Sequence, residues 1–228
     1  MDLREISKFE ALAARWWDTG GQLGALHAIN PLRVAYIVGR CQLTGQRVLD
    51  VGCGGGILAE ALAARGARVT GIDMGEGPLS AARQHLQGTG LAVEYRRTTP
   101  EALAASEAGG YDRVTCMELL EHVPQPDSVV AACGTLVKPG GDVFFATINR
   151  NPKAFLLAIA GAEYLLGLLA RGTHTYAGFV KPAELRRWAL RAGLVCRDIT
   201  GMHYNPITRR YKLGGNTHVN YFAHFRRN

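Results

Sequence analysis

Residues 47–56 constrain the fold of this chain more than any other stretch. Val48, Leu49 and Val51 form a short apolar run of the kind found in buried parallel strands. The glycines of residues 52–56 then break the run, and strong helix formers follow from 57 to 65. A strand, a glycine turn and a helix in this order predict the first corner of a nucleotide-binding α/β sheet. A less specific alternative is a turn that only lets a helix pack on a strand.

Two carboxylates indicate which nucleotide this corner binds. Asp50 lies two residues before Gly52, where it would repel a pyrophosphate but attract the amino group or sulfonium of S-adenosylmethionine. Asp73 follows the second apolar run, in the position where an acidic residue accepts hydrogen bonds from ribose hydroxyls. Gly52 and Gly54 allow the backbone to approach the ligand closely. The pair of acids therefore favours S-adenosylmethionine over a dinucleotide as the cofactor.

Apolar runs and helical segments alternate along the chain. Further strands are expected at residues 68–72, 93–96, 112–117 and 142–148. This alternation predicts an α/β fold with a Rossmann-like, doubly wound, mostly parallel sheet. We expect one domain over residues 1–228: N-terminal helices in 1–45, a cofactor-binding core in 46–150, an apolar and basic insertion with helical character after the fifth strand in 151–192, and C-terminal strands in 193–228.

Composition limits the compartment and the partners. The formal net charge of +7 suits an anionic membrane or a nucleic acid, or simply a solvated surface; we expect no nucleic-acid partner. Five cysteines without a Cys-x-x-Cys pair indicate a reducing compartment. The N-terminal residues lack the apolar core of a signal peptide, and no apolar run reaches the length of a membrane span. We therefore expect a cytoplasmic protein.

The stretch 154–170 is almost entirely apolar, with Glu163 in its middle and bases on either side. It is too short and too interrupted to span a bilayer. A buried helix is the simplest interpretation. Two alternatives are a segment that lies in the interface of an anionic membrane and a cover over a lipid-like substrate.

The residues after the fourth expected strand are the strongest candidates for chemistry. Glu118, Glu121 and His122 are spaced so that a helical turn would place all three side chains on one face. Two carboxylates and an imidazole suit a divalent metal, Mg²⁺ above all. Alternatively, His122 is a general base in a metal-free reaction, or the glutamates only cap a loop. We select Glu121 and His122 as catalytic candidates, and all three as metal candidates.

The N-terminal part contributes two further expectations. Asn30 and Pro31 predict the start of a helix that runs to about residue 40. Arg33 would project from this helix, and its guanidinium suits the carboxylate of the cofactor's methionine half. Trp16 and Trp17 are expected to pack in the core, with a lid over the cofactor as the alternative.

Longer stretches resemble a known family. The chain is similar to the class I S-adenosylmethionine-dependent methyltransferases, and within them to the bacterial O-methyltransferases of ubiquinone biosynthesis. The matching stretches cover almost the whole chain and are residues 8–18, 27–33, 49–60, 114–124, 136–145 and 201–207. The tryptophan pair, the Glu-Leu-Leu-Glu-His block and the tail make the resemblance more specific than the glycine turn alone.

The resemblance implies methylation of catechol-type hydroxyls on a polyprenylated phenol and on a demethylubiquinol. It implies that Arg33, Gly52, Asp73 and Met117 hold the cofactor; we add Asp50, Gly54 and Met74 to that set. It also implies a divalent metal, a peripheral position on the inner face of the cytoplasmic membrane, and contact with other ubiquinone-biosynthesis proteins. The alternatives are methylation of a soluble small phenol and a cofactor-binding subunit that has lost catalysis.

Overall fold

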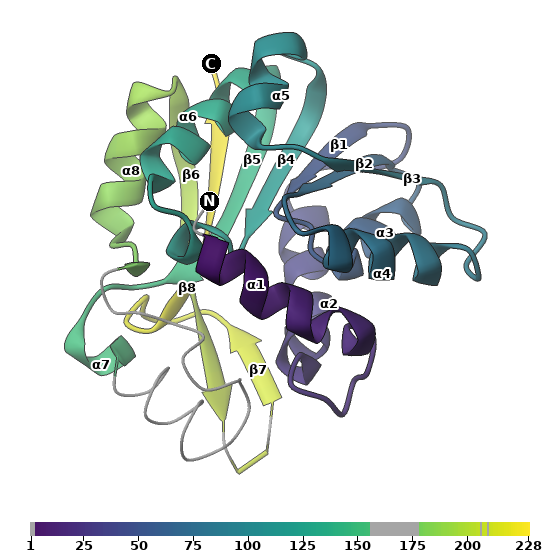
Figure 1. The fold of residues 1–228 in the computed structure, drawn as a ribbon. Helices are drawn as coiled ribbons and strands as arrows, with labels where there is room; N and C mark the ends of the chain where they lie inside the picture. Colours follow the sequence, from purple (N-terminus) through teal and green to yellow (C-terminus); the bar gives the residue numbers. More distant parts are fainter. Residues whose placement is uncertain (1–2, 156–177, 206, 209) are drawn as a thin grey trace.

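Eight strands form one sheet in the part of the chain that the structure describes (Figure 1). This computed structural model describes residues 3–155, 178–205, 207–208 and 210–228. The strands are β1 (Arg47–Val51), β2 (Arg68–Asp73), β3 (Val93–Arg97), β4 (Tyr111–Met117), β5 (Val137–Ile148), β6 (Leu194–Asn205), β7 (Arg210–Leu213) and β8 (Asn220–Arg227). Their order across the sheet is β3-β2-β1-β4-β5-β8-β6-β7.

The first five strands are parallel to one another, and the last three close the sheet with antiparallel pairs. The order reverses at β1, which has β2 on one side and β4 on the other. In open parallel sheets, ligands bind where the order reverses, beyond the carboxyl ends of the strands. The predicted doubly wound, mostly parallel sheet is therefore confirmed, and by this rule the ligand crevice is expected at the glycine turn after β1.

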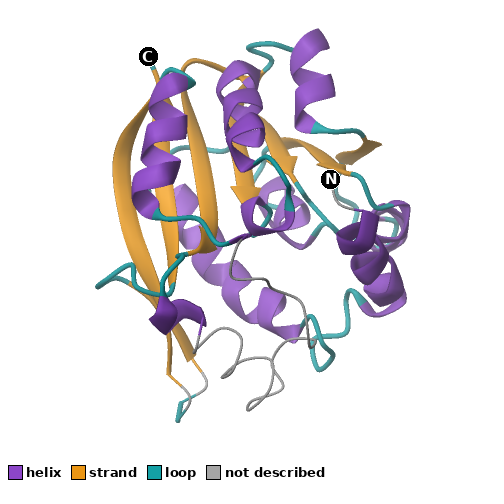
Figure 2. Ribbon diagram, turned by 60° about the vertical axis from the view of Figure 1, so that its left-hand side comes forward, coloured by secondary structure: helices purple, strands orange, loops and turns teal. Residues whose placement is uncertain are grey.

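Helices cover both faces of the sheet (Figure 2). One face carries α2, α3 and α4, and the other carries α5, α6 and α8. The helices and 3-10 turns are α1 (Leu3–Leu12), η1 (Ala13–Arg15), α2 (Gly24–Val38), α3 (Ile57–Ala63), α4 (Glu76–Leu86), α5 (Pro100–Ser106), η2 (Leu120–His122), α6 (Pro126–Leu136), α7 (Pro152–Phe155) and α8 (Pro182–Arg191). In the described residues, no helix combines the length and the apolar character that crossing a bilayer requires.

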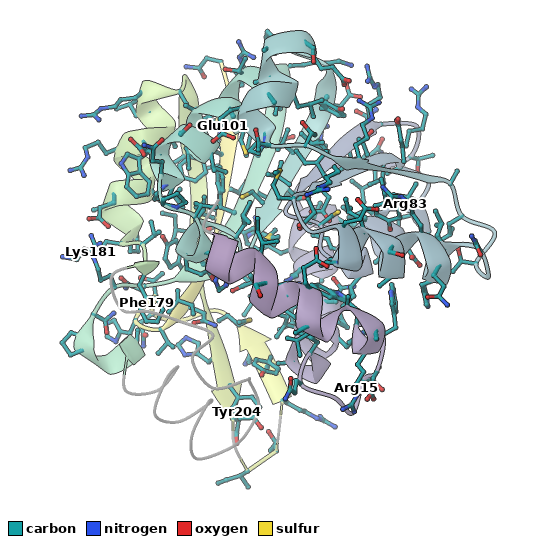
Figure 3. All side chains as sticks on the ribbon, in the orientation of Figure 1. Arg15, Arg83, Glu101, Phe179, Lys181 and Tyr204 are labelled. Carbon is teal, nitrogen blue, oxygen red and sulfur yellow. The ribbon has the colours of Figure 1, made fainter. Side chains whose placement is uncertain are left out.

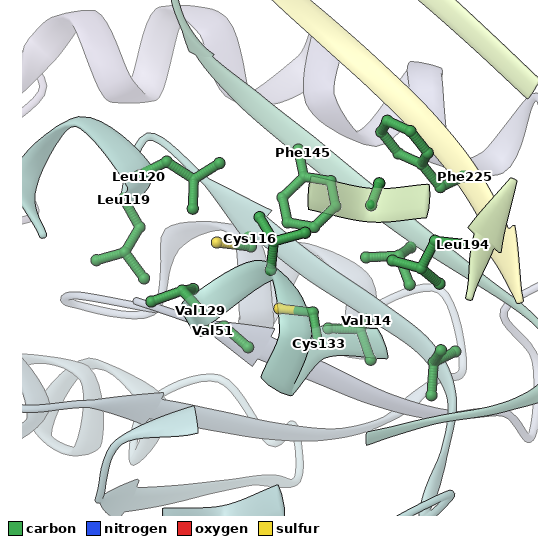
Figure 4. Close-up of a cluster of buried hydrophobic side chains, with 14 of the residues drawn as sticks. Val51, Val114, Cys116, Leu119, Leu120, Val129, Cys133, Phe145, Leu194 and Phe225 are labelled. Atoms are coloured by element: carbon green, nitrogen blue, oxygen red, sulfur yellow. The ribbon is translucent and has the colours of Figure 1, made fainter. Parts of the chain in front are cut away.

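Alternate residues of each central strand point to opposite faces, which divides the core in two. Leu49 belongs to the buried cluster to which α5, α6 and α8 contribute, while its neighbour Val48 belongs to the cluster to which α2, α3 and α4 contribute. Phe145 and Phe144 divide in the same way on β5. Figure 4 shows the first cluster, in which Cys116 of β4 and Phe145 meet side chains of α6 and of the antiparallel strands. Burial on both faces is what the continuous apolar runs predicted.

One helix differs from the sequence-based expectations, and one expected segment is not tested. The helix that carries Arg33 begins at Gly24 rather than at Asn30, so Pro31 lies inside it. Proline removes one backbone donor there, and packing against α3 and the sheet compensates. Most of the apolar stretch 154–170 falls outside the described residues, so its predicted roles stay predictions.

Candidate active site

The turn after β1 has the backbone conformation that its glycines were expected to provide. Gly52, Gly54 and Gly56 all have positive φ, of 73°, 51° and 86°. The amides of Gly52 and Cys53 both donate to the carbonyl of Ile72, at 2.9 and 3.0 Å, which ties the turn to β2. Side chains other than glycine rarely adopt this conformation. The turn is therefore fixed in shape before α3 begins.

Trp16 packs directly on this turn. A Cβ placed on Gly54 would lie 2.3 Å from Cζ2 of Trp16, and one on Gly55 would lie 2.2 Å from its Cδ1. Trp17 donates its indole N–H to the Gly55 carbonyl at 3.0 Å and stacks on His85 at a centroid distance of 3.3 Å. The tryptophans are packing residues, as expected, but they pack on the glycines. A role as a lid over the cofactor stays a prediction.

Asp73 ends β2 beside the turn. One of its carboxylate oxygens accepts a hydrogen bond from the Gly54 amide at 3.0 Å, and the other accepts from the Gly75 amide at 2.8 Å. Burial raises the pKa of Asp73, and these amides oppose the rise. Each oxygen keeps a second acceptor position. The geometry therefore fits the predicted contact with ribose hydroxyls. Its neighbour Met74 contributes a backbone carbonyl that accepts from Arg97 at 3.1 Å.

Asp50 lies deeper than the sequence suggested. Its side chain is only 2% exposed and accepts a hydrogen bond from the Thr115 hydroxyl of β4 at 2.7 Å. Burial raises the pKa of Asp50 to about 6, opposed by Thr115 and by the positive charge of Arg33. Because it is buried, the carboxylate of Asp50 influences the crevice through its charge. Direct contact with the cofactor's cationic groups stays a prediction.

Arg33 is the buried cation of the site. Its Nη2 lies 3.7 Å from Oε1 of Glu118, and the carboxylates of Asp50 and Glu121 also stabilise its charge. Burial nevertheless lowers the pKa of Arg33. Its Nε and Nη2 have no hydrogen-bond partner among the described residues. Buried donors without acceptors are costly, so this guanidinium fits an incoming carboxylate.

Glu118 follows the last residue of β4 in an unusual conformation. Its φ is 56°, and it is the one non-glycine residue with positive φ in the described ranges. Its amide still donates to the Ala146 carbonyl of β5 at 2.9 Å, so the strain lies between two paired strands. The preceding residue, Met117, is buried at the end of β4, on the face that packs with α2 and α3. Glu118 lies near Arg33, and Leu119 lies against Gly52, so this segment is next to the glycine turn; its contact with a ligand stays a prediction.

Glu121 and His122 lie in the short turn η2. Glu121 is 6% exposed; its Oε2 accepts from the Thr147 hydroxyl at 2.8 Å, while its Oε1 has no partner among the described residues. Burial raises the pKa of Glu121 to about 7, helped by the charge of Glu118. The ring of His122 meets Phe9 of α1 edge-on, at 5.4 Å between centroids.

The three-ligand metal site expected from Glu118, Glu121 and His122 is not assembled in this structure. Across the described residues, no three His, Cys, Asp or Glu side chains are grouped so as to hold a metal ion. The physical reason is local: η2 is a 3-10 turn rather than an α-helix, and Glu118 precedes it with a left-handed backbone that directs its carboxylate to Arg33. The donor set therefore does not fit a divalent ion in this conformation.

Sequence reasoning missed several polar partners of the site. Thr115 and Thr147 occupy the carboxyl halves of β4 and β5 and hold Asp50 and Glu121. Glu10 of α1 accepts from the Gly77 amide at 2.9 Å, so α1 connects α4 to the turn after β4. A threonine within an apolar strand is a sequence signal that could have identified Thr115 and Thr147. The sequence has no such signal for Glu10, because its partner is 67 residues away.

Comparisons with known proteins agree with this geometry. Residues 27–199 match a family model described as a methyltransferase domain. A ubiquinone biosynthesis O-methyltransferase of Azotobacter vinelandii is 61% identical over 221 residues, which is 97% of this chain and 95% of the relative. One of Pseudomonas aeruginosa is 57% identical over 227 residues, 100% and 98% of the two chains.

Solved structures support the fold. A magnesium protoporphyrin IX methyltransferase of Synechocystis with bound S-adenosylhomocysteine superposes with a TM-score of 0.68 at 20% identity, covering 94% of each chain. At this identity the likeness concerns the fold alone. Together with the near full-length relatives, these findings show that the chain belongs to the ubiquinone biosynthesis O-methyltransferase family.

Proposed function

We propose that this protein transfers the methyl group of S-adenosylmethionine to a catechol-type hydroxyl of the polyprenylated phenols and quinols of ubiquinone biosynthesis. The observation that carries the proposal is the buried Arg33, whose Nε and Nη2 have no hydrogen-bond partner among the described residues, together with Asp73 at the glycine turn. This arrangement offers a fork for the cofactor's carboxylate and an acceptor for its ribose. The substrate class comes from the names of relatives at 57–61% identity.

The chain must also prepare the nucleophile. A phenol ionises near pH 10, going by tyrosine, so only about a thousandth of it is phenolate at neutral pH. A general base works best when its pKa lies near the operating pH. The pKa of Glu121 is raised to about 7, and its Oε1 has no partner among the described residues. We assign to Glu121 the removal of the phenol proton, with the imidazole of His122 as the alternative acceptor. Methyl transfer then requires the nucleophile and the methyl carbon to be held in line.

A divalent metal and a membrane surface belong to the proposal only as predictions. The resemblance implies a metal. In this structure, however, Glu118 lies near Arg33, and Glu121 accepts a hydrogen bond from Thr147. Contact of the apolar stretch 154–170 with lipid was an alternative to a buried helix, and most of the stretch falls outside the described residues. Neither prediction is needed for the assignments to Arg33, Asp73 and Glu121.

The test is a methyl-transfer assay on the purified chain, with labelled S-adenosylmethionine, a short-chain demethylubiquinol analogue, and parallel reactions with and without chelator. We expect a methylated ether as product. Activity that survives the chelator would assign proton removal to Glu121 or His122, and activity that requires a metal would restore the metal prediction. Calorimetry that detects tight binding of NAD and none of S-adenosylhomocysteine would overturn the proposal.

A further inference from the structure

Asn220, the first residue of β8, carries a side-chain amide to which the proposed reaction assigns no role. Its Oδ1 is buried and has no hydrogen-bond partner among the described residues. An acceptor left unpaired in the interior costs about 1–3 kcal/mol, so its presence in a folded chain calls for a reason. Arg33 and Glu121 also have buried atoms of this kind, and both belong to the candidate active site.

Strand register places Asn220 at the same edge of the sheet as these two residues. Met117, the last residue of β4, is level with Ala146 of β5, and Ala146 is level with Phe222 of β8. Because β8 runs antiparallel to β5, Asn220 lies two residues farther toward the carboxyl ends of the parallel strands, about 7 Å at the rise of a strand. β8 is two strands from β4, which corresponds to about 10 Å across the sheet. Asn220 therefore lies on the far side of β5 from the end of β4.

The side chain of Asn220 lies on the face of the sheet that α2 covers. Residues two apart on a strand point the same way, so Asn220 points to the face of Phe222. Phe222 belongs to the buried cluster to which α2 contributes, and so does Met202 of β6, which pairs with Asn220. Arg33 approaches Glu118 from α2. Asn220 and Arg33 are thus on the same side of the sheet.

The base assigned above, Glu121, is held at the same end of β5. The hydroxyl of Thr147 donates to Glu121 at 2.8 Å. The next residue, Ile148, ends β5 and is level with Asn220. The carboxylate of Glu121 and the amide of Asn220 are therefore positioned by the last two residues of one strand.

Two tyrosines lie at this end of the sheet, on β6 and β7. Tyr204 and Tyr211 are paired across the two strands, with ring centroids 4.7 Å apart. Figures 1 and 3 show β7 and Tyr204 at the carboxyl ends of the parallel strands, opposite to the C-terminus. Tyr211 packs against the same cluster as Met202; burial raises its pKa, and Tyr204 and the charge of Glu118 add to the rise. An aromatic and apolar wall of this kind suits the side of a phenol ring.

The partner that Asn220 lacks must be a donor, because a carbonyl oxygen only accepts hydrogen bonds. The cofactor's carboxylate and ribose are already assigned to Arg33 and Asp73, on α2 and β2. A catechol has two neighbouring hydroxyls, and methyl transfer uses one of them. The other keeps its proton and can donate a hydrogen bond. The methyl acceptor therefore supplies the group that Asn220 requires.

We propose that Asn220 determines specificity for the methyl acceptor: its Oδ1 accepts a hydrogen bond from the catechol hydroxyl that is not methylated, and Tyr211 lies beside the ring. The inference rests on the proposed function and deepens it, because it names the residue that selects a catechol over a phenol with one hydroxyl. With this bond formed, the neighbouring hydroxyl faces Glu121 and the methyl donor. The same bond fixes which of the two hydroxyls is methylated.

The test compares two short-chain acceptors on the full chain with labelled S-adenosylmethionine: a prenylated catechol and the matched phenol that lacks the second hydroxyl. We expect the wild-type chain to prefer the catechol in kcat/KM about a hundredfold, because the phenol leaves the amide unpaired. Asn220→Ala should reduce this preference about tenfold or more, mainly through a lower kcat/KM for the catechol. Asn220→Asp keeps an acceptor oxygen and should retain most of the preference.

Asn216 provides the matched control. It is exposed in the connection before β8, and its Oδ1 accepts a hydrogen bond from the His218 amide at 3.1 Å. Asn216→Ala should alter both acceptors equally and leave the preference unchanged. A general effect of Asn220→Ala on folding would also lower both rates together, so the ratio separates specificity from structure. No preference in the wild-type chain, an unchanged preference in Asn220→Ala, or an equal loss in Asn216→Ala would overturn the proposal.

The position of methylation is a second readout that a merely structural role would not change. With an unsymmetrical catechol, the wild-type chain should form one methyl ether in large excess, and Asn220→Ala should form a mixture of the two. Nuclear magnetic resonance of the products distinguishes the ethers. The same single ether from both chains would contradict the assignment of Asn220.

Calorimetry with S-adenosylhomocysteine bound and chelator present separates this inference from the proposed function. The wild-type chain should bind the catechol more tightly than the phenol, and Asn220→Ala should lose the difference. If the wild-type chain methylates neither acceptor but shows this binding pattern, the proposed function falls and the assignment of Asn220 stands. If it methylates the catechol and Asn220→Ala keeps the full preference, the assignment falls and the proposed function stands. A preference that appears only when a divalent ion is added would overturn the hydrogen bond as its cause.

Discussion

The crevice has two parts that differ in how completely their polar groups are hydrogen-bonded. At the turn after β1, both oxygens of Asp73 are occupied by backbone amides, and Trp16 fills the space above Gly54 and Gly55. At the end of β4, buried Arg33 and Glu121 keep atoms without hydrogen-bond partners among the described residues. The first part therefore has a fixed shape with its polar groups paired. The second part has buried charged groups that a ligand could pair with.

This contrast follows from what each part must do. A cradle for a nucleoside requires a fixed backbone, which the glycines supply, and an acceptor for the ribose that is held in place, which Asp73 and its two amide contacts supply. Proton removal requires a carboxylate whose pKa lies far above its ordinary value, and burial with incomplete pairing provides that. Substitutions in the turn should therefore act through shape, and substitutions at the end of β4 should act through charge.

The largest effect is expected from Gly54→Val. Valine is strongly disfavoured at a φ of 51°, and its Cβ would lie 2.3 Å from Trp16. We expect the affinity for S-adenosylhomocysteine, measured by calorimetry, to fall about 1000-fold or more, equal to about 4 kcal/mol. Gly90→Ala is the control, because Gly90 has a φ of 69° but nothing within 4 Å of a Cβ. It should lower the free energy of unfolding by about 1 kcal/mol and leave binding intact. Normal binding by Gly54→Val would show that the turn is not the cradle.

The same contrast explains what the sequence could predict. The glycine turn, Asp73 and the positions of the parallel strands along the chain follow from local signals, since each depends on neighbours in the chain. Partners such as Thr115 for Asp50 are 65 residues away, and only the assembled sheet brings them together. The α-helical spacing assumed for Glu118, Glu121 and His122 failed because tertiary contacts imposed a 3-10 turn and a left-handed residue. The start of α2 was predicted wrongly at Asn30 and Pro31 for a related reason, because packing outweighed the tendency of proline to break a helix.

Glu121→Gln tests the charged part of the crevice. The wild-type rate should fall as the pH drops through about 7, because protonation removes the acceptor. The glutamine variant keeps the shape and the contact with Thr147, but we expect its kcat to be lower by about several hundredfold and nearly independent of pH in this range. Steady-state kinetics from pH 5.5 to 8.5 on the short-chain analogue measure both. A variant that retains the wild-type profile would transfer the role to His122, and Glu76→Gln on the exposed first turn of α4 controls for the lost charge.

Arg33→Gln separates charge from shape in cofactor binding. Removing the guanidinium should weaken S-adenosylhomocysteine about a hundredfold, because a charge-assisted fork to its carboxylate is lost. Methylthioadenosine lacks that carboxylate, so its affinity should be almost unchanged. The ratio of the two affinities, measured by calorimetry, cancels general effects on folding. Arg40→Gln, at a partly exposed ion pair just beyond the same helix, should leave the ratio unaltered. Equal losses for both ligands would place Arg33 in the scaffold instead.

The smallest effect concerns Asp50, which lies where the two parts meet. Its pKa of about 6 in the folded chain exceeds the value of about 4 expected when unfolded, because burial disfavours the anion. Between these values the folded chain binds more protons than the unfolded chain, so the free energy of unfolding should fall as the pH rises from about 4 to 6. Asp50→Asn removes this contribution, on the order of 2 kcal/mol. Urea unfolding at pH 4.5 and 7 should therefore show a shallower fall in the variant. Asp127→Asn, an exposed carboxylate on α6, should keep the wild-type difference. An unchanged fall in Asp50→Asn would mean that burial does not raise the free energy of the charged carboxylate in the folded chain. The assignment of the incompletely paired charges to the end of β4 would then have to be withdrawn.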